Sequence, residues 1–246
     1  MSGQRRIQNE PAWLLHHRPF RDSSLILDVM SRDHGRLALV ARGSRSAKSR
    51  LKGLLRPFLP LQLSWVIRSD MGTLTGAELN GAPISLSGDA LLSAYYLNEL
   101  LINLLHRHDP QPEVFEAYSD TIRALNAKQN VAAVLRRFEM ELLRLLGYAL
   151  NLDHDTETGG ELRDEGLYEY RVAHGPVPSS RTDGPMSFSG AELLAVARQE
   201  FDDPAATKAA NRLLRNVIAW YLDGRELKSR KVFEELRRST PTMKQD

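Results

Sequence analysis

The stretch "GRLALVARGSRSAKSRLKGLLRPFLPLQLSWVIRS" (residues 35–69) carries eight Lys and Arg residues and no Asp or Glu. Apolar residues dominate or alternate at its two ends, which predicts a β-strand at 35–42 and another at 61–69. Between them the cations stand among Gly, Ser and Ala, which favours an exposed connection that a polyanion can approach closely. The eight cations are Arg36, Arg42, Arg45, Lys48, Arg50, Lys52, Arg56 and Arg68.

Three further stretches around this one read as strands, because they are short, rich in branched and aromatic residues, and bounded by turn residues. Five strands in about 80 residues, with the longest gap between the third and fourth, predict a five-stranded OB-fold β barrel. Within the gap, "SAKSRLKGLLR" (46–56) predicts a short helix that Pro57 ends. The additional strands are 12–17, 23–31 and 72–80.

The apolar period changes to three and four after residue 80, which predicts helices almost to the end of the chain. We therefore expect an α+β two-domain protein, with the barrel in residues 1–80 and an all-α helical domain in 81–246. Residues 151–187 read as an irregular polar insertion with one hairpin, and 239–246 as a disordered tail. The predicted helices are 89–108, 112–126, 131–148, 187–201, 204–224 and 227–238.

The formal net charge of +2 conceals a division along the chain. Residues 1–80 hold 13 Lys and Arg against six Asp and Glu, whereas the remainder holds 20 against 25. Such asymmetry indicates a polyanionic partner for the basic part.

Composition excludes several classes of protein. The chain has no cysteine, which excludes disulfides, thiolate zinc sites and a cysteine nucleophile. No stretch reaches the roughly 18 apolar residues of a membrane span, and the N-terminus lacks the apolar core of a signal peptide. We expect a cytoplasmic protein without membrane contact.

The sequence contains none of the common nucleotide-binding, zinc-protease or serine-hydrolase motifs. Two polar clusters leave a hydrolase open as an alternative: "HRHD" with His106 and His108, and "DHDTE" over 153–157. The second gathers Asp153, His154, Asp155 and Glu157, whose oxygen atoms could hold a divalent ion. Solvated side chains are the simpler interpretation of both, and no metal or cofactor is predicted.

Binding of nucleic acid accounts for the basic segment without catalysis. Cations of an OB-fold neutralise phosphates, and exposed aromatic rings stack on bases. Candidate stacking rings are Trp13, Phe20, Phe58 and Trp65, with burial in the barrel as the alternative for each. The candidate DNA-binding cations are Arg36, Arg42, Arg45, Lys48, Arg50, Lys52 and Arg56; a second basic group, Lys228, Arg230 and Lys231, is the alternative surface.

The chain resembles the bacterial RecO family of DNA repair and recombination mediators over nearly its whole length. The stretches that carry this resemblance are "RPFRDSSLILDV" (18–29), "GRLALVARGSRSAKSRLKGLLRPFLPL" (35–61), "YLNELL" (96–101), "LRRFEMELLRLLGY" (135–148) and "LKSRKVFEEL" (227–236).

The resemblance implies an N-terminal OB-fold and a C-terminal helical domain. It implies binding to single- and double-stranded DNA and annealing of complementary strands. It also implies loading of a recombinase onto DNA coated by the single-stranded-DNA-binding protein, together with the partner RecR. Many members of the family hold a four-cysteine zinc site after the third main helix, whereas this chain reads "NLDHDTETGGELRDEG" (151–166) there. We therefore expect the cysteine-free branch of the family, without zinc.

The family also binds the acidic, apolar C-terminal tail of the single-stranded-DNA-binding protein through its helical domain. Such a tail requires an apolar pocket with cations at its rim. The residues predicted for this contact are Arg136, Arg137, Arg215 and Tyr221, of which Arg136 matches the family's motif best; solvated positions on packed helices are the alternative.

An RNA-binding module and a transcription regulator also remain open. An RNA-binding OB-fold module would prefer structured RNA to single-stranded DNA. A transcription regulator would bind duplex DNA through a recognition helix, whereas the basic residues of this chain lie in the predicted strands and their connection.

Overall fold

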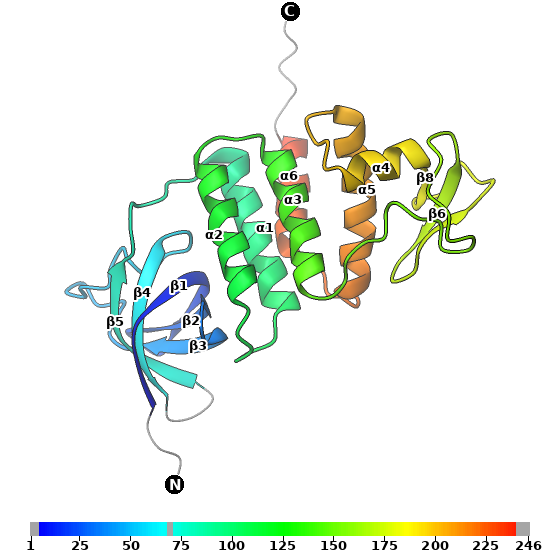
Figure 1. Ribbon diagram of the computed structural model, residues 1–246. Helices are drawn as coiled ribbons and strands as arrows, with labels where there is room; N and C mark the ends of the chain where they lie inside the picture. Colours follow the sequence, from blue (N-terminus) through cyan, green and yellow to red (C-terminus); the bar gives the residue numbers. More distant parts are fainter. Residues whose placement is uncertain (1–4, 68–70, 240–246) are drawn as a thin grey trace, which may run out of the picture. The chain divides into compact units, whose positions relative to one another are not determined.

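A computed structural model describes residues 5–67 and 71–239 of the chain. Five strands close into a barrel in the order β1-β2-β3-β5-β4, which confirms the predicted five-stranded OB-fold (Figure 1). Pairing is antiparallel except between β3 and β5, which run parallel over three residue pairs. The strands are β1 (Arg5–Phe20), β2 (Ser24–Ser31), β3 (Gly35–Ala41), β4 (Pro60–Ile67) and β5 (Met71–Leu79).

Strand β1 is longer than the predicted 12–17 because it serves two neighbours. Its first half pairs with β4 and its second half with β2, and the register shifts between Ile7 and Glu10 and again between Leu14 and His16. Bulges of this kind bend a strand and allow one strand to close a barrel. The barrel core includes Leu14, Leu27, Leu39, Leu63 and Trp65, all fully buried.

The connection between β3 and β4 is a series of turns, so the short helix predicted over 46–56 is wrong. Successive backbone hydrogen bonds join residues three apart: the Ser46 amide donates to the Gly43 carbonyl, and the Ser49 amide to the Ser46 carbonyl. Gly53 adopts a φ of +88°, which an α-helix cannot accommodate. Serine side chains add local bonds that compete with helical ones, including Ser49 Oγ accepting from Leu51 N.

Within the described residues, six helices follow the barrel, which confirms the predicted helical region (Figure 1). The chain packs as two compact units: residues up to Asn126 with those from Leu227 onward, and residues Ala127–Glu226. The helices are α1 (Gly88–Leu104), α2 (Pro112–Asn126), α3 (Val131–Leu145), α4 (Gly190–Ala197), α5 (Pro204–Tyr221) and α6 (Lys228–Ser239). Of the predicted tail 239–246, the last seven residues lie outside the described part.

In the first unit, a buried polar network attaches α1 and α2 to the barrel. The indole Nε1 of Trp13 donates to Ser119 Oγ at 2.8 Å, and Asn98 Nδ2 donates to the Leu15 carbonyl at 2.8 Å. The Tyr118 hydroxyl donates to Asn98 Oδ1. A fully satisfied network in a low-dielectric interior fixes the geometry of the elements that share it. The barrel and these helices therefore form one body.

The connection between α1 and α2 rests against the start of β3. Gly35 has a φ of +66°, and a Cβ atom at this position would lie 2.2 Å from the Asp109 carbonyl oxygen. The His108 amide donates to the Arg36 carbonyl at 2.8 Å. Only glycine satisfies both the left-handed backbone and the close approach.

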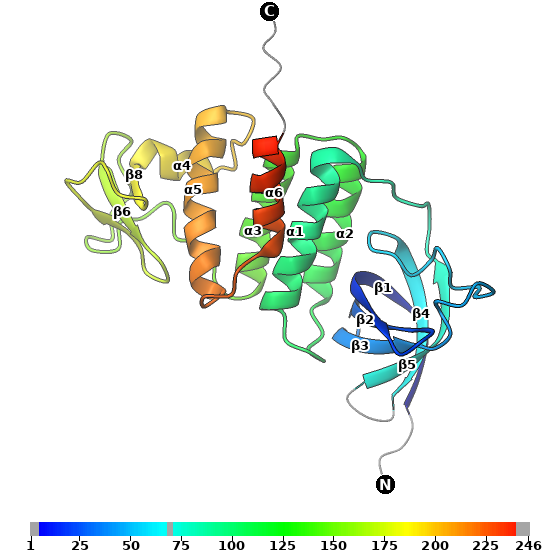
Figure 2. The ribbon, with the colours of Figure 1, turned by 180° about the vertical axis from the view of Figure 1, so that it is seen from behind.

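Helix α6 returns to the first unit and packs against α1 (Figure 2). The Glu99 carboxylate accepts from the backbone amides of Lys228 and Ser229 at 2.8 and 2.9 Å, and from the Ser229 hydroxyl. Because these amides begin a helix and have no intrahelical acceptor, the carboxylate acts as a cap from a distant part of the chain.

The second unit combines α3, α4 and α5 with a small sheet of order β7-β6-β8. The hairpin expected within residues 151–187 is present as β6 (Leu167–Arg171) and β7 (Gly175–Pro178), and β8 (Ser187–Ser189) joins it. Ser189 and Glu192 form a capping box at the start of α4.

Candidate nucleic-acid interface

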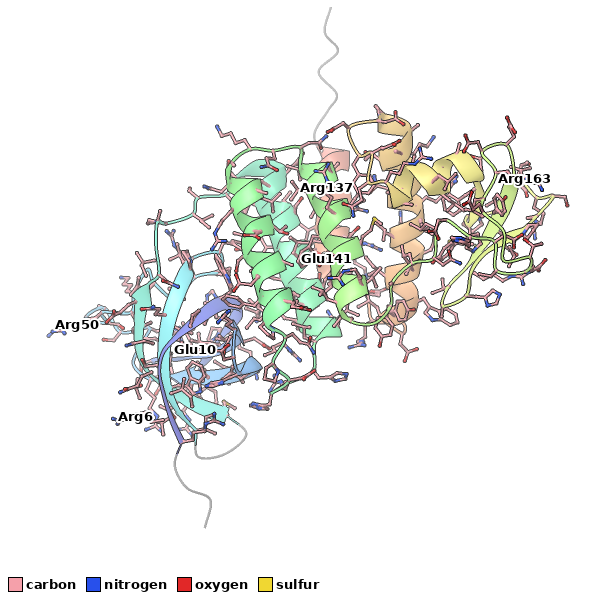
Figure 3. The ribbon with its side chains drawn as sticks, in the orientation of Figure 1. Arg6, Glu10, Arg50, Arg137, Glu141 and Arg163 are labelled. Atoms are coloured by element: carbon pink, nitrogen blue, oxygen red, sulfur yellow. The ribbon has the colours of Figure 1, made fainter. Side chains whose placement is uncertain are left out.

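The cationic segment, residues 42–56, projects from the barrel, and Arg50 points away from it (Figure 3). Within residues 5–67 and 71–239, no ion pair joins any Lys or Arg of this segment to a carboxylate. Exposed cations without acidic neighbours are available to phosphate groups. The exposed cations are Arg42, Arg45, Lys48, Arg50, Lys52 and Arg56.

Arg45 attaches this segment to the turn between β1 and β2. Its amide donates to the Ser23 carbonyl at 2.9 Å, and its Nη1 reaches the carbonyls of Arg21 and Asp22 at 3.4 and 3.3 Å. Arg21 is exposed at the same turn, with its guanidinium 5.1 Å from the centre of the Phe20 ring. Arg21 is not among the predicted contacts, because this proximity arises only from the strand pairing.

Arg36 differs from the other predicted DNA-binding residues. Its Nη1 lies 3.3 Å from both Asp28 oxygens, and its side chain is only 12% exposed. Arg107 approaches the same carboxylate at 3.7 Å. Arg36 therefore has a structural partner in the barrel wall. Arg68 lies outside the described residues.

Most of the predicted stacking rings are buried. Trp13 and Trp65 are 2% and 0% exposed, and Phe58 is 5% exposed. Phe20 is half-buried beneath the Arg21 guanidinium. Burial, the alternative considered for each ring, therefore holds for three of the four.

The residues predicted to bind a peptide tail differ in their surroundings. On α3, Arg136 is buried and donates to Glu139 Oε1 at 2.9 Å, whereas Arg137 is exposed (Figure 3). Consecutive helical residues point about 100° apart, so both cannot face one ligand equally. The Arg137 guanidinium lies 5.9 Å from the ring centre of Phe201. Arg215 is exposed on α5.

Tyr221 lines a cavity of about 300 Å³ within the second unit. Its ring stacks on Tyr148 with centres 4.1 Å apart. Burial, and to a smaller extent Tyr148, raises the pKa of Tyr221, and burial does the same for the pKa of Tyr170. These hydroxyls therefore stay neutral hydrogen-bonding groups. The other lining residues are 147–151, Tyr170, Ala173 and His174, so none of the three predicted arginines lines the cavity.

Of the two polar clusters considered for hydrolysis, the first is exposed and the second organises its own loop. His106 and His108 are exposed in the α1–α2 connection. Asp155 organises its loop: burial would raise the pKa of this carboxyl, but hydrogen bonds from the Glu157 amide and the Thr158 hydroxyl and amide lower it. In the described residues, no group of three or more His, Asp or Glu side chains could hold a metal ion. Nor is any helix there long and apolar enough to cross a bilayer.

Two family models match the chain, and together they cover most of it. Recombination protein O N terminal matches residues 5–82, and Recombination protein O C terminal matches residues 85–231. The boundary between them falls in the link that joins β5 to α1.

Curated relatives carry the name DNA repair protein RecO. The protein of Azoarcus sp. (strain BH72) is 42% identical over 96% of this chain and 99% of its own length. That of Dechloromonas aromatica (strain RCB) is 40% identical with the same coverage, and that of Photobacterium profundum is 42% identical over 90% of this chain and 93% of its own. With both family models matched in order along the chain, this protein belongs to the RecO family.

Proposed function

We propose that this protein acts in DNA repair and recombination by binding single-stranded DNA through its cationic segment and annealing complementary strands. The observation that carries the proposal is the set of six exposed Lys and Arg side chains in residues 42–56, which form no ion pair with a carboxylate in the described structure. The names of the relatives, DNA repair protein RecO, support the same process.

Annealing requires no bond chemistry. Two complementary strands repel each other through their phosphates, and a protein that neutralises both raises the rate of productive encounter. Lys and Arg on a turn-rich segment contact phosphates without reading base edges, so the expected binding is tolerant of sequence. Double-stranded DNA presents the same phosphates and belongs to the same proposal.

The proposed partners follow from the family. We infer that the protein works with RecR and loads a recombinase onto DNA coated by the single-stranded-DNA-binding protein, in the bacterial cytoplasm and near the nucleoid. For the acidic tail of the coating protein, the exposed Arg137 is better suited than Arg136, which Glu139 already engages. A labelled tail peptide should therefore lose affinity on Arg137→Ala, and unchanged affinity would remove Arg137 from the contact.

An annealing assay tests the proposed function. Changing Arg42, Arg45, Lys48 and Arg50 together to Ala should slow protein-dependent annealing of complementary oligonucleotides at moderate salt. The matched control changes four exposed, ion-paired arginines, Arg123, Arg171, Arg181 and Arg198, and removes the same formal charge. Equal annealing by the two variants would contradict the proposal.

Competition with RNA distinguishes the proposed function from its alternative, an RNA-binding OB-fold module. The cationic segment contacts phosphates, which both nucleic acids carry, so preference must be measured. Displacement of single-stranded DNA by structured RNA at much lower concentration than by unlabelled DNA would favour an RNA-binding module instead.

A further inference from the structure

The phosphate-binding surface lacks the aromatic platforms that usually accompany it. Single-stranded nucleic acid is held by cations along the backbone and by rings stacked on bases. Three of the four predicted rings lie in the interior, and Phe20 is half-covered by Arg21. If bases stack on the first unit, another of its described rings is therefore needed.

Tyr95, on α1, is the most exposed of the Phe, Tyr and Trp side chains that the structure describes in the first unit, at 45%. Its ring meets the Phe58 ring edge to face, with centres 4.9 Å apart and planes inclined by 76°. Phe58 follows the end of the cationic segment by two residues. The exposed ring therefore lies next to the point where the basic connection re-enters the barrel.

The backbone conformation of Phe58 indicates that the surrounding structure holds its ring against Tyr95. This residue has a φ of +68°, a conformation that a bulky side chain rarely adopts. Non-glycine residues in this region persist only where the surroundings impose them, and they gather at functional sites. Here the strained residue presents its ring to Tyr95 while remaining 5% exposed itself.

Cations of α6 also lie against α1 close to Tyr95. Glu99 stands one helical turn further along α1 and receives the first amides of α6, which begins with the exposed Lys228. Arg230 places its guanidinium 5.6 Å from the ring centre of Tyr96. The basic start of α6 therefore contacts α1 within one helical turn of Tyr95.

We propose that Tyr95 is a base-stacking platform for single-stranded nucleic acid, adjoining the phosphate contacts of the cationic segment. The inference rests on the proposed function and adds to it a residue of the helical part of the chain. A tyrosine ring stacks on any base, so this contact strengthens binding without adding sequence preference.

Titration of two fluorescent oligonucleotides of equal length tests this role, one with a base at every position and one with an abasic site at every position. Tyr95→Leu keeps an apolar contact with Phe58 but has no ring, and Tyr95→Phe keeps the ring. The matched control is Tyr148→Leu, which removes a comparably exposed ring, 42%, from the second unit.

Tyr95→Leu should weaken binding of the base-containing strand by about fivefold to 150-fold. Its salt dependence should match that of the wild type, and the abasic strand should bind both proteins equally. Tyr95→Phe and Tyr148→Leu should bind as the wild type does. Equal binding of the base-containing strand by Tyr95→Leu and wild type would overturn the inference, as would an equal loss on the abasic strand. Failure of the wild type to bind either strand would overturn the proposed function as well.

Discussion

The cationic segment and helix α3 both show arginines in the sequence, but the structure gives these arginines opposite surroundings. Arg50 is exposed on the segment that projects from the barrel (Figure 3). Arg136 is 8% exposed and holds Glu139, which is 0% exposed. The first is available to a phosphate; the second already has its anion. An arginine is therefore a candidate ligand contact only when the fold leaves it exposed and without a carboxylate.

The same contrast separates residues that are close in sequence. The sequence groups Arg36 with Arg42, yet Arg36 pairs with Asp28 in the barrel wall, whereas Arg42 is exposed beyond the end of β3. Removing Arg36 would leave a half-buried carboxylate with less compensation, so a DNA-binding defect in an Arg36 variant would combine structural and electrostatic effects.

The largest expected effect is a difference in the free energy of unfolding between a variant at Arg136 and a variant at Arg50. Arg136→Ala removes the cation from a buried carboxylate and should lower the free energy of unfolding by about 3 kcal/mol. Arg50→Ala, on an exposed turn, should change it by less than about 0.5 kcal/mol. Urea denaturation of both variants at pH 7 measures the difference. Similar midpoints for the two would show that the contrast between the regions is wrong.

A second experiment compares glycines with nearly equal φ in the two environments of the first unit. Gly35 and Gly43 have φ of +66° and +65°, but a Cβ at Gly35 meets the Asp109 carbonyl, whereas nothing lies within 4 Å at Gly43. Gly43→Ala should cost only the conformational penalty, about 1 kcal/mol, and Gly35→Ala at least about 2 kcal/mol. Thermal unfolding of the pair measures this; equal losses would mean that the α1–α2 connection yields readily.

The smallest expected effect concerns a second ion pair on α3. Glu141 and Arg144 have the same three-residue spacing as Arg136 and Glu139, but their side chains are 41% and 59% exposed. A hydrogen bond from Arg144 lowers the pKa of Glu141; burial opposes this lowering, and the Arg144 charge adds to it.

Because the pKa is lower in the folded state, this contribution is present above the ordinary glutamate pKa and disappears as the pH falls through the folded value. Solvent screens the pair, so Glu141→Gln should cost less than about 0.5 kcal/mol at pH 7 and nothing at a pH below both values. Unfolding measured across the acidic range tests the sign. A loss that grows toward low pH would contradict it.

Much of the fold is predictable because local signals agree with it. Alternating apolar residues indicate the five strands, and the change of period after residue 80 indicates the helical region. The capping box at Ser189 is readable from spacing alone. By contrast, the composition of 46–56 favours a helix where the structure has turns, since Gly53 and the serines act through backbone geometry that composition does not display.

The candidate site is predictable only in part. The absence of acids near residues 42–56 is visible in the sequence, and the structure leaves those cations exposed. The partners of Arg36 and Arg136 are not, because a carboxylate eight or three residues away becomes a partner only through strand register or helix packing. The role of Tyr95 is not predictable from the sequence for a related reason: the Phe58 ring that it contacts lies 37 residues away in the chain.

The most direct test of the central claim is a salt series of single-stranded DNA binding, with wild type and the variant changed to Ala at Arg42, Arg45, Lys48 and Arg50. For each phosphate contacted, the plot of log K against log salt should fall with a slope of about −0.7. The variant should bind more weakly and with a shallower slope, while the control lacking Arg123, Arg171, Arg181 and Arg198 keeps the wild-type slope. Identical slopes for the wild type and the cationic-segment variant would contradict the claim that this segment holds the DNA backbone.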